Sequence, residues 1–150
     1  MNNFGFIIDG IPVAKGRPRF ANVKGYARIY TPIETKNAEG MIEWLASNAM
    51  RSNGNQMLLI EPLTVFLEFR MPIPKSFSKA KTLSCLCGET VPTFRPDSDN
   101  LAKTVLDAMN KTVYRDDSQI IDLIVRKRYA ETPCTIVSVK EYKNQGNYYL

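Results

Sequence analysis

The chain has 150 residues, 44% of them hydrophobic, which fits one soluble globular domain with its own core. Its formal net charge of +5 favours a polyanionic partner such as nucleic acid or, less specifically, an acidic membrane surface. The absence of histidine excludes Ser-His and Cys-His catalysis, and no apolar run is long enough to span a membrane. The N-terminus lacks the features of a signal peptide, so we expect a cytoplasmic protein.

The N-terminal third is predicted to contain one strand and one long helix. Residues 4–8 read as a strand, and the glycine- and proline-rich residues 10–30 as a loop or irregular ribbon. Residues 31–34 (TPIE) have the pattern of a capping box with proline at the first helical position. Apolar residues at three- and four-residue spacing then predict a helix that continues to about Ser52.

The rest of the chain is predicted to hold three strands and two helices. Alternating apolar residues predict a strand over 63–71, and a short basic helix over 76–86 ends before Gly88. Residues 99–110 are predicted to form a helix with a narrow apolar stripe opposite a charged face. Residues 120–129 and 135–142 read as two strands joined by a turn, as a hairpin.

Residues 95–122 contain six aspartates and no glutamate within an otherwise basic chain. If the chain stays extended to Asp99, the carboxylates of Asp97 and Asp99 converge, and Asp99 lies at or beside a helix N-terminus. Lys103 follows one turn later on the same face, where it could neutralise a phosphate, and Asp116 and Asp117 form an adjacent pair. Hard oxygen ligands without histidine or cysteine select Mg²⁺ or Mn²⁺, whose bound water can attack phosphorus.

Ordinary structural roles remain open for the same residues. Asp99 could be only a helix cap, Asp97 only a turn residue, and Lys103 with Asp107 only a surface ion pair. Residues 116–117 could be solvated charges that precede a strand. The three cysteines (Cys85, Cys87 and Cys134) are too few for a zinc site without histidine and read as buried or incidental thiols.

A second cluster, in residues 14–28, contains five basic residues and no acidic one: Lys15, Arg17, Arg19, Lys24 and Arg28. Basic residues mixed with glycine and an aromatic ring suit contacts to a nucleic-acid backbone. A solvated flexible loop is the alternative interpretation.

The spacing of these motifs resembles that of a known family. Residues 97–103 (DSDNLAK), then Asp107-Ala108, then residues 116–120 (DDSQI) resemble the D-x-D-N-L-x-K…D-A-L…D-D-x-Q-[IV] pattern of the RusA family. Its members are Holliday-junction resolvases, small endodeoxyribonucleases of bacteria and prophages. Residues 15–19 (KGRPR) and 30–32 (YTP) resemble a common subtype, whereas residues 75–94 match least well.

The resemblance implies a fold, an assembly and site residues. The fold would be α+β, a small mixed β-sheet packed against two main helices in one domain over residues 1–150, working as a homodimer. Asp97, Asp99 and Asp117 would be the essential metal ligands, with Asp116 assisting or structural and Lys103 as the catalytic lysine. Two symmetry-related sites would cut opposing strands of a four-way junction.

We therefore expect a Mg²⁺-dependent resolvase of DNA recombination and repair, with Mn²⁺ as a substitute metal and no small-molecule cofactor. It would be bacterial or prophage-encoded and nucleoid-associated, without a membrane partner. Two alternatives stay open: a branched-DNA binding module that does not cut, and a structure-selective phage nuclease with a broader substrate range. The backbone phosphates would be bound by segment 14–28 together with Lys75, Lys79 and Lys81.

Overall fold

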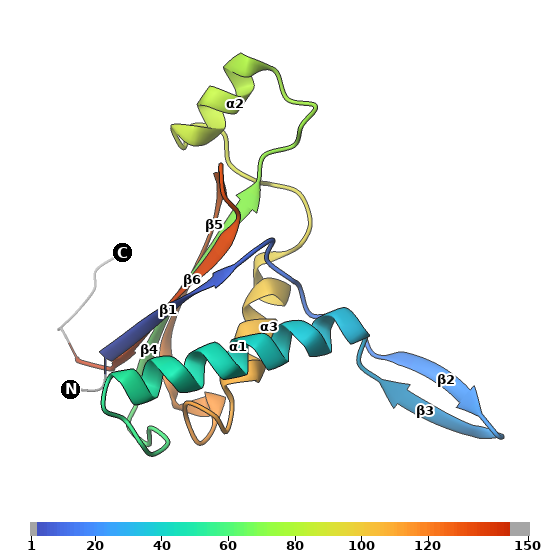
Figure 1. The fold of residues 1–150 in the computed structure, drawn as a ribbon, viewed down its shortest axis with the longest axis vertical. Helices are drawn as coiled ribbons and strands as arrows, with labels where there is room; N and C mark the ends of the chain where they lie inside the picture. The colour runs from blue at the N-terminus through green and yellow to red at the C-terminus, as the bar shows by residue number, and fades with distance from the viewer. Residues whose placement is uncertain (1–2, 145–150) are drawn as a thin grey trace.

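A four-stranded mixed sheet forms the centre of the computed structural model, which describes residues 3–144 apart from the side chains of residues 23, 26 and 28–30 (Figure 1). Its strand order is β1-β6-β4-β5. The four strands are β1 (Asn3–Asp9), β6 (Cys134–Glu141), β4 (Leu63–Pro72) and β5 (Ile120–Ala130). Because β4 pairs antiparallel with β6 and parallel with β5, the sheet is mixed, which confirms the predicted α+β class.

The predicted hairpin of the last two strands is wrong. Both strands exist, but β4 lies between them, so Leu67 pairs with Val125 of β5 on one side and with Val137 of β6 on the other. Strands that are neighbours in sequence usually pair, which is why the sequence favoured a hairpin. Periodicity shows that a segment is a strand, but it does not show which strand is its partner.

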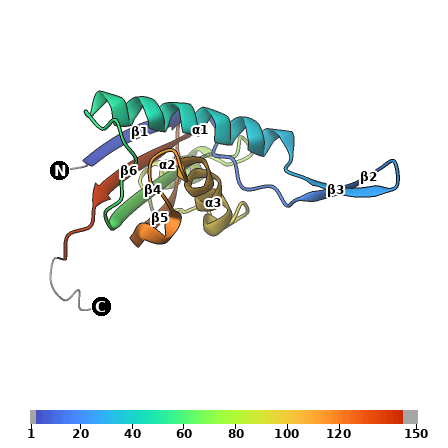
Figure 2. The same cartoon turned by 90° about the horizontal axis from the view of Figure 1, so that it is seen from below.

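One face of the sheet carries the core. Along β4 every second residue is buried, from Leu63 to Met71, while the residues between them are half-buried. Two helices cover the buried face, α1 (Ile33–Ser52) and α3 (Ser98–Met109), and Figure 2 shows α1 running along β1. The two main helices of the prediction are therefore confirmed. The buried face of α3 is wider than the predicted narrow stripe, because Ala102 and Thr104 are buried together with Leu101, Val105, Ala108 and Met109.

The start of α1 differs from the predicted capping box. Pro32 occupies the N-cap position, outside the first helical turn, and no side chain caps the helix there. Thr35, 2% exposed, instead accepts a hydrogen bond from the backbone N–H of Gly16 at 3.0 Å. A β-carbon on Gly16 would lie 2.7 Å from the Pro32 Cγ atom and 2.9 Å from the Thr35 hydroxyl oxygen. Only glycine therefore lets this segment pack so closely on the helix N-terminus.

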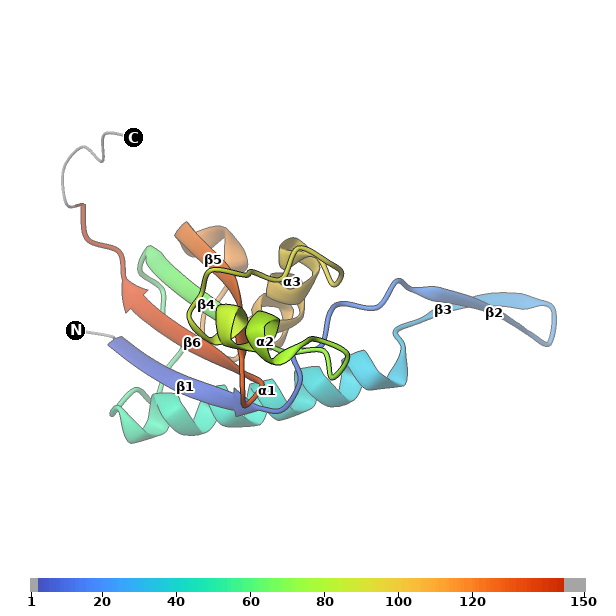
Figure 3. The same ribbon diagram turned by 90° about the horizontal axis from the view of Figure 1, so that it is seen from above.

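The prediction of an irregular segment is wrong for residues 19–30. β2 (Arg19–Val23) and β3 (Tyr26–Tyr30) form an antiparallel hairpin that projects from the body of the protein, as Figure 3 shows. Lys24 and Gly25 form its two-residue turn, both with positive φ (51° and 81°), as the common tight hairpin turns require. Lys-Gly is not the usual Asn-Gly or Asp-Gly signal, so the turn was missed.

A short basic helix is confirmed as α2 (Lys79–Leu86), which begins three residues later than predicted and lies at one end of the sheet beside β5 (Figure 1). Ser78 caps it by accepting a hydrogen bond from the Lys81 N–H, and Gly88, with a φ of 80°, follows its end. Within residues 3–144, no helix combines the length and apolarity needed to cross a bilayer.

Candidate active site

α3 presents the first acidic motif. Asp97 is its N-cap residue, its backbone oxygen accepts a hydrogen bond from the Leu101 N–H at 3.1 Å, and its side chain makes no capping bond. The helix begins at Ser98, so the expectation of an extended chain up to Asp99 is wrong. Asp97 keeps extended backbone angles outside the helix, whereas Asp99 lies in the first helical turn, so the alternation of an extended chain does not place the two carboxylates on one side.

Asp99 and Asp117 line one open pocket with a volume of about 390 Å³. Lys103 and Asp107 line the same pocket from α3, and Leu123 and Val125 of β5 form its apolar wall. The structure thus brings together three of the four predicted catalytic residues, although Asp117 is 18 positions from Asp99 in the chain. Asp97 does not line this pocket.

The turn that carries Asp117 is held by a glutamine. Asp116 caps the short 3₁₀ helix Asp117–Gln119 by accepting a hydrogen bond from the Ser118 N–H at 3.3 Å. The Gln119 side chain accepts a bond from the Asp116 N–H at 2.9 Å and donates to the Leu59 and Glu61 carbonyl oxygens at 3.1 and 3.0 Å. Asp116 therefore closes the turn, and Gln119 links that turn to the segment before β4.

The paired carboxylates disturb each other's ionisation. The side-chain hydrogen bond with Asp116, in which the protonated Asp117 carboxyl donates, raises the pKa of Asp117. Slight desolvation and the charges of Asp116 and Asp107 add to this rise, and Lys103 opposes it. The pKa of Asp116 is lowered, first by its hydrogen bond with Asp117. The pocket thus concentrates negative charge, which a bound cation would relieve.

Asp107 has two lysine partners. Its Oδ2 atom lies 3.0 Å from Lys15 Nζ, and its Oδ1 atom lies 3.4 Å from Lys103 Nζ. Lys15 also pairs with Glu39 of α1, and its backbone N–H donates to the Asn100 carbonyl at 3.0 Å. Burial tends to lower the pKa of Lys15, but the hydrogen bonds and charges of Glu39 and Asp107 raise it overall. The predicted Lys103–Asp107 pair is confirmed, and Lys15 ties the β1–β2 segment to both main helices.

Asp97 lines a neighbouring pocket of about 620 Å³ that is mainly basic, with Lys15, Arg17 and Arg95 among its lining residues. The segment before Asp97 is held by Lys127 of β5, whose Nζ atom donates to the Phe94 and Pro96 carbonyl oxygens at 2.9 and 3.0 Å. Two pockets of opposite charge therefore flank the N-terminus of α3.

The carboxylate oxygens of this region are suitable ligands for a hard divalent cation, although they do not surround a metal position on all sides. In the described part of the chain, no three acidic or cysteine side chains are grouped closely enough to surround a metal. Mg²⁺ typically binds through only one or two carboxylates plus substrate phosphates and keeps several waters. Three aspartates line the pocket of Asp99 and Asp117, and one of them, Asp107, is paired with two lysines. The other two, Asp99 and Asp117, match that donor set, and Asp97 lies at the helix N-cap.

The predicted DNA-binding residues lie on two separate elements. Arg17, Arg19 and Lys24 are exposed on or before the β2–β3 hairpin, while the side chain of Arg28 lies outside the described residues. Lys75, Lys79 and Lys81 are exposed on and before α2, where the Lys81 ammonium sits 3.9 Å from the centre of the Phe77 ring. Lys15 differs from the others because it is already paired.

Sequence reasoning missed four contributors to this region: Asp107 as a shared partner of two lysines, Glu39, Gln119 as a clamp, and Lys127. Of these, Asp107 and Gln119 stood inside the family pattern, so their spacing was a usable signal, whereas no motif marked Glu39 or Lys127. Tyr114, which lies just before the second acidic motif, is fully buried and donates a hydrogen bond to the Leu106 carbonyl at 2.7 Å. Burial, with the charges of Asp117 and Asp107, raises its pKa.

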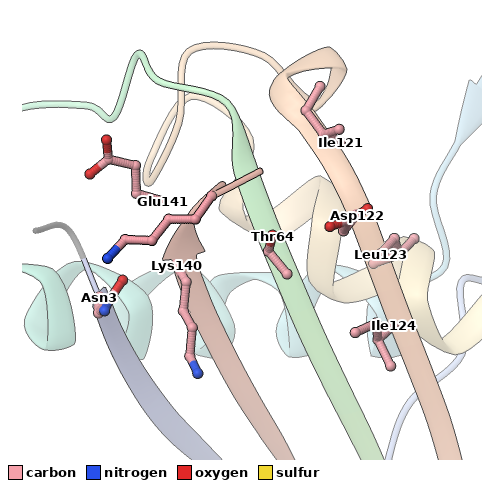
Figure 4. A pocket seen from close by; sticks show the side chains of 9 residues that line it. Asn3, Thr64, Ile121, Asp122, Leu123, Ile124, Lys140 and Glu141 are labelled. Atoms are coloured by element: carbon pink, nitrogen blue, oxygen red, sulfur yellow. The ribbon is translucent and has the colours of Figure 1, made fainter. Parts of the chain in front are cut away.

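A larger pocket, of about 810 Å³, lies on the open face of the sheet (Figure 4). Asp122, Thr64 and Lys140 project from neighbouring strands there, and Asp122 pairs with Thr64 in the sheet register. None of the predicted catalytic residues lines it. The three cysteines are unbridged, with Cys85 and Cys134 buried and Cys87 exposed.

Comparison with known proteins identifies the family. The family model described as "Endodeoxyribonuclease RusA" matches residues 9–140, which include both acidic motifs and the Gln119 clamp. One relative, "Uncharacterized protein YqaN" of Bacillus subtilis (strain 168), is 34% identical over 143 residues, covering 94% of this chain and 98% of the relative. RusA enzymes hydrolyse phosphodiester bonds in DNA and are generally divalent-metal-dependent. The chain belongs to the RusA family of endodeoxyribonucleases.

Proposed function

We propose that this chain is a Mg²⁺-dependent resolvase that cuts four-way DNA junctions by paired symmetric nicks as a homodimer. One observation carries the proposal: Asp99 and Lys103 of α3 share a pocket with Asp117, which comes from a separate motif. The helix alone explains why Asp99 and Lys103 lie close together, but it does not explain why Asp117 lies in the same pocket. A binding module that does not cut has no use for this convergence, and the family is one of nucleases.

Asp99 and Asp117 would hold the metal, with Asp97 as the third carboxylate. Support for Asp97 comes from its exposed N-cap position and from a side chain that is not used for capping. A bound Mg²⁺ would lower the pKa of a water molecule and polarise the scissile phosphate. Asp116 would act indirectly, because its carboxylate closes the turn that presents Asp117.

Lys103 would neutralise negative charge on the scissile phosphate or on the leaving oxygen. Its side chain is 60% exposed, and its ammonium lies 3.4 Å from the Asp107 carboxylate. Such an i,i+4 pair contributes only about 0.3–0.5 kcal/mol, so a phosphate can readily replace it. Asp107 keeps the ammonium beside the pocket until the substrate arrives.

DNA would be held by the basic residues on both elements. Arg17, Arg19, Lys24 and Arg28 would contact backbone phosphates on the hairpin side, and Lys75, Lys79 and Lys81 on the α2 side. Phosphate contacts position a protein on DNA without reading its sequence, which suits an enzyme that recognises structure. A homodimer would match the two-fold symmetry of a junction.

The decisive experiment incubates the protein with a synthetic mobile four-way junction and Mg²⁺ and maps the cuts on all four strands. We expect nicks at symmetric positions on two opposing strands, and none when a chelator is present. The Asp99→Asn variant should lose cleavage. Asp122→Asn is the matched control, because it makes the same change on the open face of the sheet and should cut normally.

Two results would contradict the proposal. Full cleavage by Asp99→Asn at saturating Mg²⁺ would remove that carboxylate from the reaction. Equal cleavage of three-way, four-way and linear substrates would favour the broader branched-DNA nuclease over a resolvase.

A further inference from the structure

We propose that Phe94 stacks on a base at the branch point and makes the enzyme selective for branched over linear DNA. The inference rests on the proposed function, because it assumes that the substrate contains a branch. It concerns a residue outside both acidic motifs, in the part of the chain where the family resemblance is weakest.

The ring of Phe94 is 74% exposed, although phenylalanine is usually among the more buried residues. Exposure alone would mean little, since single apolar side chains are common on surfaces. Among the side chains that the structure describes, two other aromatic rings are similarly exposed, Phe20 on β2 at 76% and Trp44 on α1 at 62%. Among these three, only Phe94 lies within three residues of a predicted metal ligand.

The backbone on both sides of Arg95 is held by hydrogen bonds from a lysine of β5. Lys127, in the C-terminal half of β5, donates to the carbonyl oxygens of Phe94 and Pro96, at 2.9 and 3.0 Å. Both bonds are charge-assisted and therefore stronger than those between neutral groups. The ring is thus presented by a fixed platform, and an aromatic side chain loses little conformational entropy on binding because it has only two rotatable bonds.

The surroundings of the ring fit nucleic acid rather than an apolar protein partner. Arg95 follows it directly and lines the basic pocket with Arg17 and Asp97. Cations beside a free aromatic ring form the combination that binds single-stranded segments: the cations hold phosphates while the ring stacks on a base of any sequence. Four-way junctions expose bases at the crossing point, whereas a linear duplex must first be unstacked, at a cost of a few kcal/mol. The ring therefore adds affinity only where a branch already exists.

Junction affinity, duplex affinity and base unstacking test the inference together. The substrates are a four-way junction and a linear duplex, each with the fluorescent base 2-aminopurine at the central position, and a chelator keeps them uncut. Phe94→Ala should weaken junction binding about 5- to 150-fold and leave duplex binding unchanged. The rise in 2-aminopurine fluorescence that the wild type causes at the branch should disappear.

Further variants separate stacking from simple hydrophobic contact. Phe94→Trp should retain junction affinity, and Phe94→Leu should lose as much as Phe94→Ala, because leucine is apolar but cannot stack. Trp44→Ala, which removes an exposed aromatic ring from α1, is the matched control and should behave as wild type. Thermal melting should show all four variants to be folded, since neither ring is buried.

Three outcomes would overturn the inference. A Phe94→Ala protein with wild-type junction affinity and wild-type fluorescence change would show that the ring does not touch the branch. Wild-type junction affinity of Phe94→Leu would show that the contact is apolar and does not involve stacking. A wild-type chain that binds no four-way junction at all would overturn the proposed function, and this inference with it; in the first two outcomes the proposed function stands.

Discussion

Gln119 is the side chain whose replacement tests most directly how Asp117 reaches the acidic pocket. Its amide makes three hydrogen bonds, one with the Asp116 N–H and two with the carbonyls of Leu59 and Glu61. Replacement by leucine keeps a similar volume and removes all three bonds. We expect a less stable protein in which the turn is no longer fixed to the segment before β4.

The size of the effect follows from those contacts. A neutral hydrogen bond contributes about 0.5–1.5 kcal/mol net, so three give about 1.5–4.5 kcal/mol. Gln119 is only half-buried, so water will replace part of the loss, and we expect about 2 kcal/mol. In a domain of this size that lowers Tm by about 4–8 °C. Because a misplacement of about 1 Å near reacting groups can reduce the rate about 100-fold, cleavage should fall about 10- to 100-fold.

Urea denaturation measures the stability change, and junction cleavage at a temperature where both proteins are folded measures the rate. Gln56→Leu is the matched control, because Gln56 is exposed in the loop just before Leu59. This control should change the free energy of unfolding by no more than about 0.5 kcal/mol, the usual limit for surface positions, and should leave the cleavage rate unchanged.

The expected pattern is a loss of both stability and rate. If Gln119→Leu unfolds at the wild-type urea concentration and cuts at the wild-type rate, other contacts hold the turn and the reasoning is wrong. If stability falls while the rate at saturating Mg²⁺ is unchanged, Gln119 serves the fold but does not position Asp117.

Three further predictions concern ligands, packing and pH. Asp97→Asn should abolish cleavage while junction binding stays equal or becomes tighter, because a negative charge near phosphate is removed; gel-shift and cleavage assays on one preparation measure both. Gly16→Ala should destabilise the protein by about 1–3 kcal/mol in urea melts, because its β-carbon would lie 2.9 Å from the Thr35 hydroxyl oxygen; a neutral result would mean that the helix N-terminus yields easily. The raised pKa of Asp117 means that this carboxylate takes up a proton at a higher pH than an ordinary aspartate as the solution is acidified. Asp116→Asn removes the main cause, so the acidic limb of Mn²⁺ binding, measured by paramagnetic relaxation, should move to lower pH; an unmoved limb would exclude the coupling.

Local features of the chain were predictable because they depend on neighbours in sequence. The three- and four-residue spacing in α1 and α3 and the alternation in β4 place apolar side chains on one face, so these elements followed from periodicity. The same holds for the Asp99–Lys103 face of α3. The acidic motifs were also recognisable as those of a known family, which no periodicity would have shown.

Contacts between distant segments were decided only by the tertiary structure. The insertion of β4 between β5 and β6, and the pairing of Lys15 with Glu39 and Asp107, join residues far apart in the chain. Spacing fixes which way a side chain points on its own element, but the partner across the interface depends on how all the apolar faces are buried together. For this reason the sequence identified the aspartates, whereas packing decided that Asp99 and Asp117 share a pocket while Asp97 lines the basic one beside it.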